Sequence, residues 1–495
     1  MFHYKSMTRS FYMFIFGALC VLAFAPFQWF PIAMIAPAML EKFINHKSAK
    51  QGALSSFIFG LGFFGFGISW VFVSIHDHSD APLWAAVAIT FLFVAALSAV
   101  LAMMGALYSF LSTRTKQTAL YILVFPLLWV LFEWVRTWLF TGFPWLLLGY
   151  TLIDTPLQSF APVFGVYGLS FMCVLIGMCF VRVFSVPRRT QTVLLGSIAA
   201  LLLIGVGLKH IQWTHPVGEP KVFGLVQGNI PQETKWDPAS ADAHLQTFRG
   251  LTGTLRTSHI VVWPEAAFPY SLPYGRKPML MVDRDALNAH QSLITGAVIE
   301  ENGRMYTNSV IAIGEDADGR YDKYHLVPFG EFVPFNQLLG STFDWLQLPK
   351  SFTIPGAKIQ TPLEVQGLHI APLICYEVVY PELSRLHALQ SDVLLTVSND
   401  TWFGKSLGPI QHLQMARMRA LENGRMLVRA TNNGMTAIIN ANGTIRGLAP
   451  AYQATTLTGL VTAYEGKTPI MRLGHYNLLI FMALFLALLL TKLRS

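Results

Sequence analysis

The chain has 495 residues, of which 53% are hydrophobic and only 13% are charged, and its formal net charge is +8. Soluble domains carry about a quarter charged residues, so this composition excludes an entirely soluble protein and indicates that much of the chain contacts lipid. The sequence contains neither an internal repeat nor a low-complexity tract.

Apolar runs long enough to cross a bilayer, about 20 residues, recur through the first 208 residues and once more near the C-terminus. They cover residues 11–30, 52–75, 82–112, 118–140, 158–181, 192–208 and 476–491. A further apolar segment, 31–45, is short and ends in charged residues, so its length does not decide whether it crosses.

The distribution of basic residues decides whether the short segment 31–45 crosses the membrane, because Lys and Arg mark cytoplasmic loops. The connections near 27–30, 76–81 and 141–157 contain no Lys or Arg. Basic residues cluster instead at Lys5/Arg9, Lys42/Lys47/Lys50, Arg114/Lys116, Arg182/Arg188/Arg189 and Lys492/Arg494. This alternation requires that 31–45 also crosses. We therefore predict eight spans, with both termini in the cytoplasm and residues 209–472 outside.

The same loops explain the positive net charge. They hold 12 of the 35 basic residues but only one acid, Glu41, so the rest of the chain, with 23 basic and 26 acidic residues, is slightly acidic. The charge therefore reports membrane topology, and a nucleic-acid partner is not expected. The N-terminal run also resembles a signal peptide, with "AFA" at 23–25, but Pro26 disfavours cleavage there, and we expect a retained first span.

Residues 211–472 differ from the rest, because short β-rich runs alternate there with helical ones. Strands are predicted at 221–230, 258–265, 292–300, 307–314, 368–376 and 391–400. A helix is predicted over 408–424, ending at Asn423-Gly424, and a strand pair over 425–447 with a turn at Asn442-Gly443. We predict a membrane domain of seven helices (1–210), one outer α/β domain (211–472), and an eighth membrane helix with a cytoplasmic tail (473–495).

Four cysteines occur, and three of them, Cys20, Cys173 and Cys179, lie in predicted spans, where a small apolar packing role is expected. Cys375 is the only cysteine of the outer domain and directly follows an apolar run. An extracytoplasmic thiol without a disulfide partner in its domain is exposed to oxidation. Cys375 is therefore either a buried structural thiol or a nucleophile.

A nucleophilic cysteine needs a base or a nearby cation to favour its thiolate. Glu265 ends the apolar run "IVVWPE", and Lys323 lies in "YDKYHLVPFGEFVPF", with Glu331 eight residues later. Individually, Glu265 could be a strand-end cap and Lys323 a surface lysine. A glutamate, a lysine and a cysteine in this order on successive elements of an α/β domain form a more specific pattern.

The stretches "VVWPEAAFP", "KYHLVPFGEFVPF" and "ICYEVVYPE" resemble the Glu-Lys-Cys motifs of the nitrilase superfamily. With "QGNIPQETKWD", "SNDTWFG", "FEWVRTWLFTGFPW" and the eight predicted spans, the chain is similar to one membrane-embedded branch, the bacterial apolipoprotein N-acyltransferases. The resemblance implies an α-β-β-α sandwich on the periplasmic side of a bacterial inner membrane, surrounded by membrane lipid. It implies no cofactor and no metal, and we expect a monomer.

The activity implied by the resemblance is a two-step acyl transfer. An acyl chain passes from a phospholipid to Cys375 as a thioester, and then to the N-terminal amino group of a diacylated apolipoprotein. Glu265 would be the general base and Lys323 would stabilise the oxyanion. Four more residues match supporting positions of the family: Trp236, Glu331, Tyr376 and Glu377. Three others are expected to support the scaffold: Asn399, Asp400 and Arg419.

Glu331 is expected to orient Lys323 or Glu265, and Tyr376 and Glu377 to shape the site beside the nucleophile. Trp236 could contact lipid or simply pack. The apolar stretch 325–356 is interpreted either as a lid near the bilayer or as ordinary core packing.

Two other functional classes remain open. A membrane-anchored nitrilase-type amidase would use the same triad but transfer the acyl group to water. A transporter or receptor would use intramembrane charges, of which Glu133 and Arg136 are the notable pair; mutual pairing also explains them. His76 and His78 make too small a set for a metal site.

Overall fold

The computed structural model describes residues 2–79, 81–114, 118–301, 303, 305–328, 330–332 and 353–492. Contacts divide the chain into two compact units, which are described separately. The first comprises Met1–Trp213, Phe403–Met418 and Thr468–Ser495, and the second comprises Thr214–Trp402 and Arg419–Lys467. The segment Phe403–Met418 belongs to the first unit, which was not predicted from the sequence.

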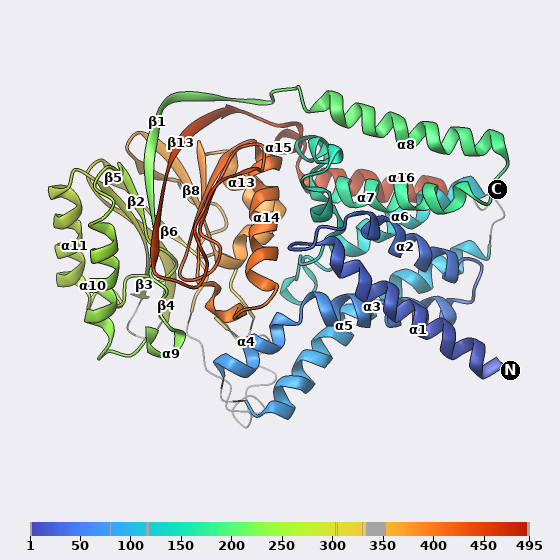
Figure 1. Ribbon diagram of the computed structural model, residues 1–495, viewed down its shortest axis with the longest axis horizontal. Helices are drawn as coiled ribbons and strands as arrows, with labels where there is room; N and C mark the ends of the chain where they lie inside the picture. Colours follow the sequence, from blue (N-terminus) through green and yellow to red (C-terminus); the bar gives the residue numbers. More distant parts are fainter. Residues whose placement is uncertain are drawn as a thin grey trace. The chain divides into compact units, whose positions relative to one another are not determined.

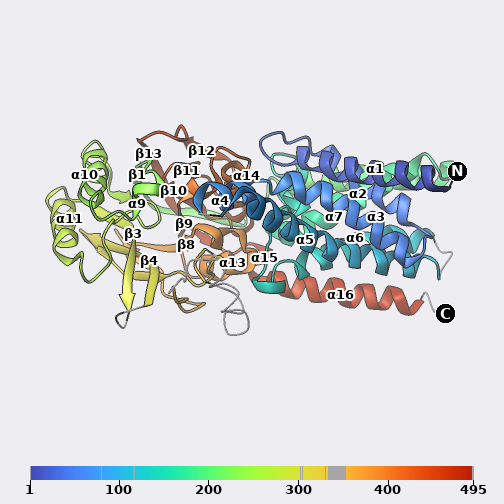
Figure 2. The same cartoon turned by 90° about the horizontal axis from the view of Figure 1, so that it is seen from below.

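The first unit is helical. Its helices are α1 (Phe2–Cys20), α2 (Pro31–Ile44), α3 (Ala49–Gly67), α4 (Trp70–His78), α5 (Leu83–Ser112), α6 (Thr118–Val135), α7 (Ala161–Val183), α8 (Arg188–Leu208), α15 (Pro469–Leu473) and α16 (His475–Lys492). Such apolar sequences form helices in lipid because a helix satisfies its own backbone hydrogen bonds. The long helices run side by side, as Figure 2 shows for α3, α5, α6 and α7.

Small residues allow α3 and α5 to approach closely. A side-chain carbon added to Gly52 of α3 would lie 2.5 Å from the carbonyl oxygen of Gly105 on α5, so glycine is required at this crossing. Helix α3 begins at a capping box, in which the Ser48 hydroxyl accepts from the Gln51 backbone N–H and the Gln51 side chain accepts from the Ser48 N–H.

The two charged residues at the end of α6 contact the irregular segment that follows it. A Glu133 carboxylate oxygen accepts from the Leu148 backbone N–H at 2.9 Å and from the Trp129 indole at 3.0 Å. Arg136 donates to the carbonyl oxygen of Trp145 at 2.5 Å. Both side chains therefore satisfy backbone groups of the segment after α6, which does not form an α-helix there.

Within the described residues, three helical stretches are long and apolar enough to cross a membrane: Leu83–Ser112, Pro156–Val183 and Arg188–Leu208. Helices α3 and α4, bent by 54°, make a fourth if they are taken together, and shorter apolar helices cover Thr8–Ala23, Ile122–Val135 and His475–Thr491. Every predicted span overlaps a helix. Helix α2, at 14 residues, is short of the roughly 20 that a bilayer requires, so eight crossings remain a prediction.

The second unit contains two β-sheets. One has the order β13 (Thr455–Gly466), β1 (Thr214–Gln227), β2 (Ile260–Val262), β3 (Ser292–Glu301), β4 (Met305–Gly314) and β6 (Arg320–Asp322). The other has the order β12 (Ile445–Leu448), β11 (Ala437–Ile439), β10 (Met426–Thr431), β9 (Val393–Ser398), β8 (Leu368–Ile374), β7 (Leu363–Val365) and β5 (Ala317–Asp318).

The middle of each sheet is parallel: β1 pairs with β2 and β2 with β3, and β8 pairs with β9 and β9 with β10. These strands are buried, which fits their continuous runs of Val, Ile and Leu. The inner faces share one apolar core, in which Phe223 and Ile260 of one sheet belong to the same cluster as Val393 and Val428 of the other.

Helices cover the outer faces of the two sheets. Figure 1 shows α10 (Ala241–Thr252) and α11 (Arg276–Asn288) side by side over the sheet that contains β2 and β3, and a second apolar cluster lies between them and that sheet. Helix α13 (Pro381–Ala388) contacts β8 and β9. These four layers agree with the α-β-β-α sandwich that the sequence predicted.

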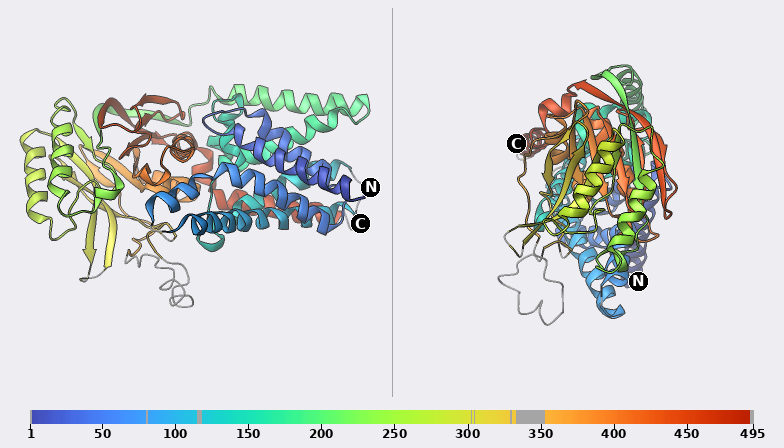
Figure 3. Two further views of the ribbon diagram at one scale, coloured as in Figure 1. Left: turned by 60° about the horizontal axis from the view of Figure 1, so that its bottom comes forward. Right: turned by 90° about the vertical axis from the view of Figure 1, so that its left-hand side faces the viewer.

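Strands β1 and β13 form a long antiparallel ribbon that runs through the unit (Figures 1 and 3). Their pairing extends from Thr214 opposite Gly466 to Gln227 opposite Thr455, with a register irregularity between Val217 and Lys221. The first and last residues of this ribbon are therefore neighbours in space.

The six strands predicted from the sequence are all present, and α14 (Gly408–Asn423) confirms the predicted helix. Strand β13 and the short strands β5, β6 and β7 were not predicted from the sequence. Strands β5, β6 and β7 have only two or three residues each. Strand β13 is longer, but exposed positions interrupt its apolar pattern.

Candidate active site

Cys375 stands at the end of β8, on the first residue of a 3₁₀ turn (Cys375–Val379). Its backbone has a φ of +53°, a left-handed conformation that is unusual for a residue with a side chain. The residue is 9% exposed. Such strained positions cluster at functional sites, which favours the nucleophile reading of this thiol over the structural one.

Glu377 holds the turn that carries Cys375. One of its carboxylate oxygens accepts from the Ile374 backbone N–H at 2.7 Å. The other accepts from the backbone N–H groups of Tyr324 and His325 and from the Tyr321 hydroxyl, at 2.8, 3.0 and 2.9 Å. Burial nevertheless raises the pKa of Glu377 to about 7, against the lowering effect of these hydrogen bonds.

Glu265 follows β2, the central parallel strand of the other sheet, and is 7% exposed. The turn that carries it crosses β3 closely, where a side-chain carbon on Gly296 would lie 2.3 Å from the Ala266 nitrogen. One carboxylate oxygen of Glu265 accepts from the Asn308 amide at 2.8 Å, and the other accepts from the Asn399 backbone N–H at 2.8 Å.

Lys323 follows β6 and is 1% exposed. Its ammonium lies 2.8 Å from a Glu331 carboxylate oxygen and 3.4 Å from a Glu265 carboxylate oxygen. Burial alone would lower the pKa of Lys323, but the charges of Glu331 and then Glu265 raise it above its ordinary value. Lys323 therefore provides a fixed positive charge between two carboxylates.

The same carboxylate pair is linked by Asn308, whose side-chain amide donates to Glu265 at 2.8 Å and to Glu331 at 3.0 Å. Burial favours a raised pKa for Glu265, yet Lys323, Lys235 and the hydrogen bonds from Asn308 and Asn399 bring this pKa below its ordinary value. Glu265 is therefore ionised at neutral pH and able to accept a proton.

The thiol of Cys375 is neutral at rest. Burial, followed by the charge of Glu265, raises its pKa to about 12, although Lys323 opposes this effect. The Ser398 hydroxyl lies 3.4 Å from the sulfur and 2.6 Å from an Asp400 carboxylate oxygen. Because the thiolate is the reactive form, a nucleophilic role for this thiol would require a base that removes its proton.

The structure brings most of the predicted site residues together. Lys323 forms ion pairs with both Glu265 and Glu331, and Cys375 interacts electrostatically with Glu265 and Lys323. Tyr376 is 8% exposed and its ring packs against Tyr380, whereas Trp236, at the end of α9 (Gln232–Lys235), is 52% exposed. Most of the predicted lid lies outside the described residues, because the structure does not describe 333–352.

Three residues make contacts with Glu265 that the sequence did not predict. Asn308 lies within the strand β4, where the polar start of "TNSVIAIG" was the available signal. Asn399, expected to support the scaffold, instead donates directly to Glu265. Lys235, in the polar stretch "QETKWD", carried no sequence signal, yet it is 7% exposed and donates to the Glu265 carbonyl oxygen at 3.1 Å.

Two charge pairs support the surrounding scaffold. Arg429 donates to an Asp400 carboxylate oxygen at 2.8 Å, and Arg419 lies 3.1 Å from Glu422, all four residues being fully buried. In the part of the chain that the structure describes, no group of three or more His, Cys, Asp or Glu side chains is arranged to hold a metal ion.

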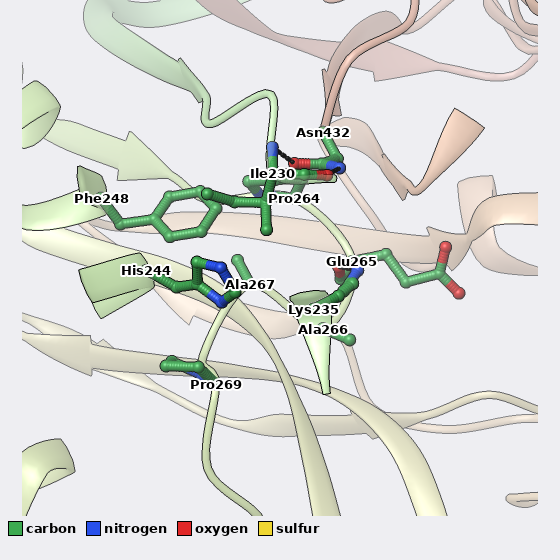
Figure 4. Close-up of a pocket in the computed structure, with 10 residues that line it drawn as sticks. All are labelled: Ile230, Lys235, His244, Phe248, Pro264, Glu265, Ala266, Ala267, Pro269 and Asn432. Atoms are coloured by element: carbon green, nitrogen blue, oxygen red, sulfur yellow. Dashed lines mark hydrogen bonds between the residues drawn. The ribbon is translucent and has the colours of Figure 1, made fainter. Parts of the chain in front are cut away.

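A small pocket adjoins Glu265 on the side of α10 (Figure 4). Figure 4 shows the Glu265 carboxylate directed away from His244 and Phe248, while Lys235 lies beside the Glu265 backbone. The lining residues are Ile230, Lys235, His244, Phe248, Pro264, Glu265, Ala266, Ala267, Pro269 and Asn432.

Comparison with known proteins gives two family matches. The N-terminal domain of apolipoprotein N-acyltransferases matches residues 16–179, and the carbon-nitrogen hydrolase family matches residues 224–468. The chain is 39% identical over 477 residues to the apolipoprotein N-acyltransferase of Coxiella burnetii, covering 96% of this chain and 98% of that protein. It is 39% identical to the enzyme of that name from Pseudomonas putida, covering 95% and 94% of the two chains.

Proposed function

Because this chain belongs to the apolipoprotein N-acyltransferase family, we propose that it N-acylates lipoproteins by a ping-pong mechanism. A fatty acyl group passes from a phospholipid to Cys375 as a thioester. It then passes to the α-amino group of the N-terminal S-diacylglyceryl-cysteine of an apolipoprotein. The observation that carries this assignment is the buried cluster of Glu265, Lys323 and Cys375.

In the first half-reaction Glu265 takes the thiol proton as the Cys375 sulfur attacks the ester carbonyl of the phospholipid. The tetrahedral oxyanion gains stabilisation from the Lys323 ammonium, whose position between two carboxylates requires no reorganisation. When the intermediate collapses, the carbon–oxygen bond breaks and the lysophospholipid oxygen takes the proton from Glu265. The enzyme is left as an acyl thioester.

In the second half-reaction the acceptor amine, in its neutral form, attacks the thioester carbonyl. Glu265 accepts a proton from the amine and Lys323 again faces the oxyanion. Collapse breaks the carbon–sulfur bond, and the departing sulfur recovers a proton from Glu265. An amide is formed and the thiol of Cys375 is regenerated.

Two supporting roles follow from the contacts. Glu331 orients Lys323, since their charged atoms are 2.8 Å apart. Glu377 fixes the turn of the nucleophile through Ile374. We propose that Tyr376, the next residue after the nucleophile, shapes the site beside it. For Trp236, half-exposed beside the buried cluster, we propose contact with the lipid acyl chain.

We also propose that the chain crosses a bacterial inner membrane eight times, with residues 211–472 on the periplasmic side, and that it acts as a monomer on donor and acceptor held in that membrane. The alternation of basic loops supports this arrangement. A helix overlaps every predicted span.

The decisive experiment separates transfer from hydrolysis. Incubation of the purified full-length chain with phospholipid alone should give a long-lived, hydroxylamine-sensitive acyl group on Cys375 and one equivalent of lysophospholipid. Addition of a diacylglyceryl-cysteine peptide should discharge this group as an amide, and Cys375→Ala should show neither step. Continuous release of free fatty acid without peptide would instead support the amidase-type reading.

A further inference from the structure

Lys235 is a buried lysine at the end of a four-residue helix. Lysines on such short segments normally keep their ammonium in water, but Lys235 is only 7% exposed. Its Nζ donates to the backbone carbonyl oxygen of Glu265 at 3.1 Å and lies 5.8 Å from the centre of the Trp236 ring. A buried ammonium is costly unless it serves a nearby charge or acceptor.

The carbonyl group that Lys235 contacts belongs to the turn that aims the general base. Within this turn Ala266 has a φ of +47°, and the Pro264 carbonyl oxygen accepts from the Gly296 N–H at 3.2 Å. Strand β3 thus anchors one carbonyl of the turn and Lys235 anchors the next. Figure 4 shows Lys235 beside the backbone from which the Glu265 carboxylate extends.

The charge of Lys235 also balances the buried cluster. The groups that face Lys235 are Glu265 after β2, Cys375 after β8 and His244 on α10. Apart from Glu377, whose pKa of about 7 leaves it partly ionised at neutral pH, the cluster contains two carboxylates and two ammonium groups, whose formal charges cancel: Glu265, Glu331, Lys323 and Lys235. The Asp400–Arg429 pair beside it is also neutral. Without Lys235 the cluster would be negative before the thiol loses its proton.

We propose that Lys235 is a positioning residue and the second cation of this site, which holds the Glu265 turn and lowers the cost of negative charge on the Cys375 sulfur. For catalysis this inference rests on the proposed acyl transfer. Its effect on the thiol is a property of the folded chain, independent of the substrate.

The proposal has a pH signature. Burial lowers the pKa of Lys235 to about 8, although Glu265 and Cys375 oppose this. Lys235 is therefore charged at pH 7 and loses its charge as the pH rises through about 8. His244, whose pKa burial and then Lys235 lower, is neutral over that interval. An arginine at position 235 would stay charged throughout.

Alkylation of Cys375 by iodoacetamide reads out the thiolate directly, with rate constants obtained by mass spectrometry of its peptide in the full-length chain. At pH 7, Lys235→Met should react about tenfold more slowly than the wild type, the effect of one pKa unit on the thiol. This ratio should fall toward one above pH 9, where the wild type has lost the charge as well.

Lys235→Arg is the conservative variant, and it should match the wild type at pH 7 and react faster above pH 9. Lys277→Met, on the exposed surface of α11, is the matched control and should behave as wild type. A wild-type to Lys235→Arg ratio that stays constant between pH 6 and 9.5 would overturn the proposal, and this comparison remains decisive if the methionine variant does not fold.

A second arm follows thioester formation from phospholipid. The wild-type rate should decline above about pH 8, and this decline should be absent in Lys235→Arg. If wild-type Cys375 gains no acyl group, the proposed function fails, while the alkylation ratios still test Lys235. Normal acylation with the same pH profile in both proteins would refute the role of Lys235 alone.

Discussion

The backbone N–H of Asn399 donates to a carboxylate oxygen of Glu265 at 2.8 Å, joining the ends of strands that belong to different sheets. Asn399 follows β9, and Glu265 follows β2. The carboxylate proposed as the base is thus held by both halves of the sandwich, and its position depends on how the two sheets pack.

Replacement of the base should affect two reactions of Cys375 in opposite directions. Glu265→Gln should slow thioester formation from phospholipid by about 10²- to 10⁴-fold, the usual effect of losing a general base. The same change removes a negative charge that raises the pKa of the thiol, so iodoacetamide should alkylate Cys375 faster. Slower alkylation together with slower acylation would indicate a disturbed fold, which Glu300→Gln on the same sheet controls for.

Lys323 is expected to matter for stability as well as for rate. Lys323→Met leaves the buried Glu265 and the partly buried Glu331 without the cation between them, and loss of one partner of a buried ion pair costs about 3–5 kcal/mol. The thermal unfolding midpoint of the full-length chain should drop, and the double variant Lys323→Met/Glu331→Gln should regain part of the loss. An unchanged midpoint in Lys323→Met would contradict the ion-pair geometry.

Glu377 should give a pH-dependent contribution to stability. Its folded pKa of about 7 lies above the ordinary value of 4.5, so the folded state holds a proton that the unfolded state has released between these values. Stability should therefore decrease as the pH rises from about 4.5 to 7, by about 3 kcal/mol from this group alone.

Glu377→Gln, neutral at every pH, should reduce that slope, as measured by the unfolding midpoint between pH 5 and 8. The variant should also loosen the turn at Cys375, because an amide has one acceptor oxygen where the carboxylate has two, and the N–H groups on one side of it lose their acceptor. A slope that equals the wild-type slope would show that Glu377 is ionised at pH 5 in the folded protein.

The topology can be tested by reporters inserted into loops. Fusions at Lys47 and Arg188 should report the cytoplasm, and a fusion at Asp237 should report the periplasm, because basic residues mark the inner loops. A cytoplasmic signal at Asp237 would contradict the eight-span arrangement.

The sequence predicted the main strands and singled out Glu265 and Cys375 because both residues follow a strong apolar run. Lys323 follows the polar stretch "GRYD" and was singled out by its motif instead. Glu265 follows "IVVWP" and Cys375 follows "IAPLI", and both runs became buried strands. A strand that is buried on both faces of a sheet consists of a continuous apolar run. Composition was therefore sufficient to predict these two strands.

What the sequence did not reveal depends on long-range packing. Lys235 looks like any lysine in a polar loop, and only the fold brings it to the carbonyl group of a residue 30 positions away. Asn308 likewise became a bridge between two carboxylates because β4 lies beside β6. The grouping of Phe403–Met418 with the helical unit depends on contacts such as the one between the Trp145 indole and Gln411, at 2.6 Å.

The pairing of Thr214 with Gly466 at one end of the β1–β13 ribbon has a mechanical consequence. A force that pulls these two ends apart loads the hydrogen bonds one at a time, as in a zipper, and not all together in shear. The ribbon would therefore open at low force from this end and through the register irregularity after Val217, and opening would meet resistance again where regular pairing resumes at Lys221 opposite Val461. Tension along the chain would be dissipated in the ribbon before it reached the strands that carry Glu265 and Cys375.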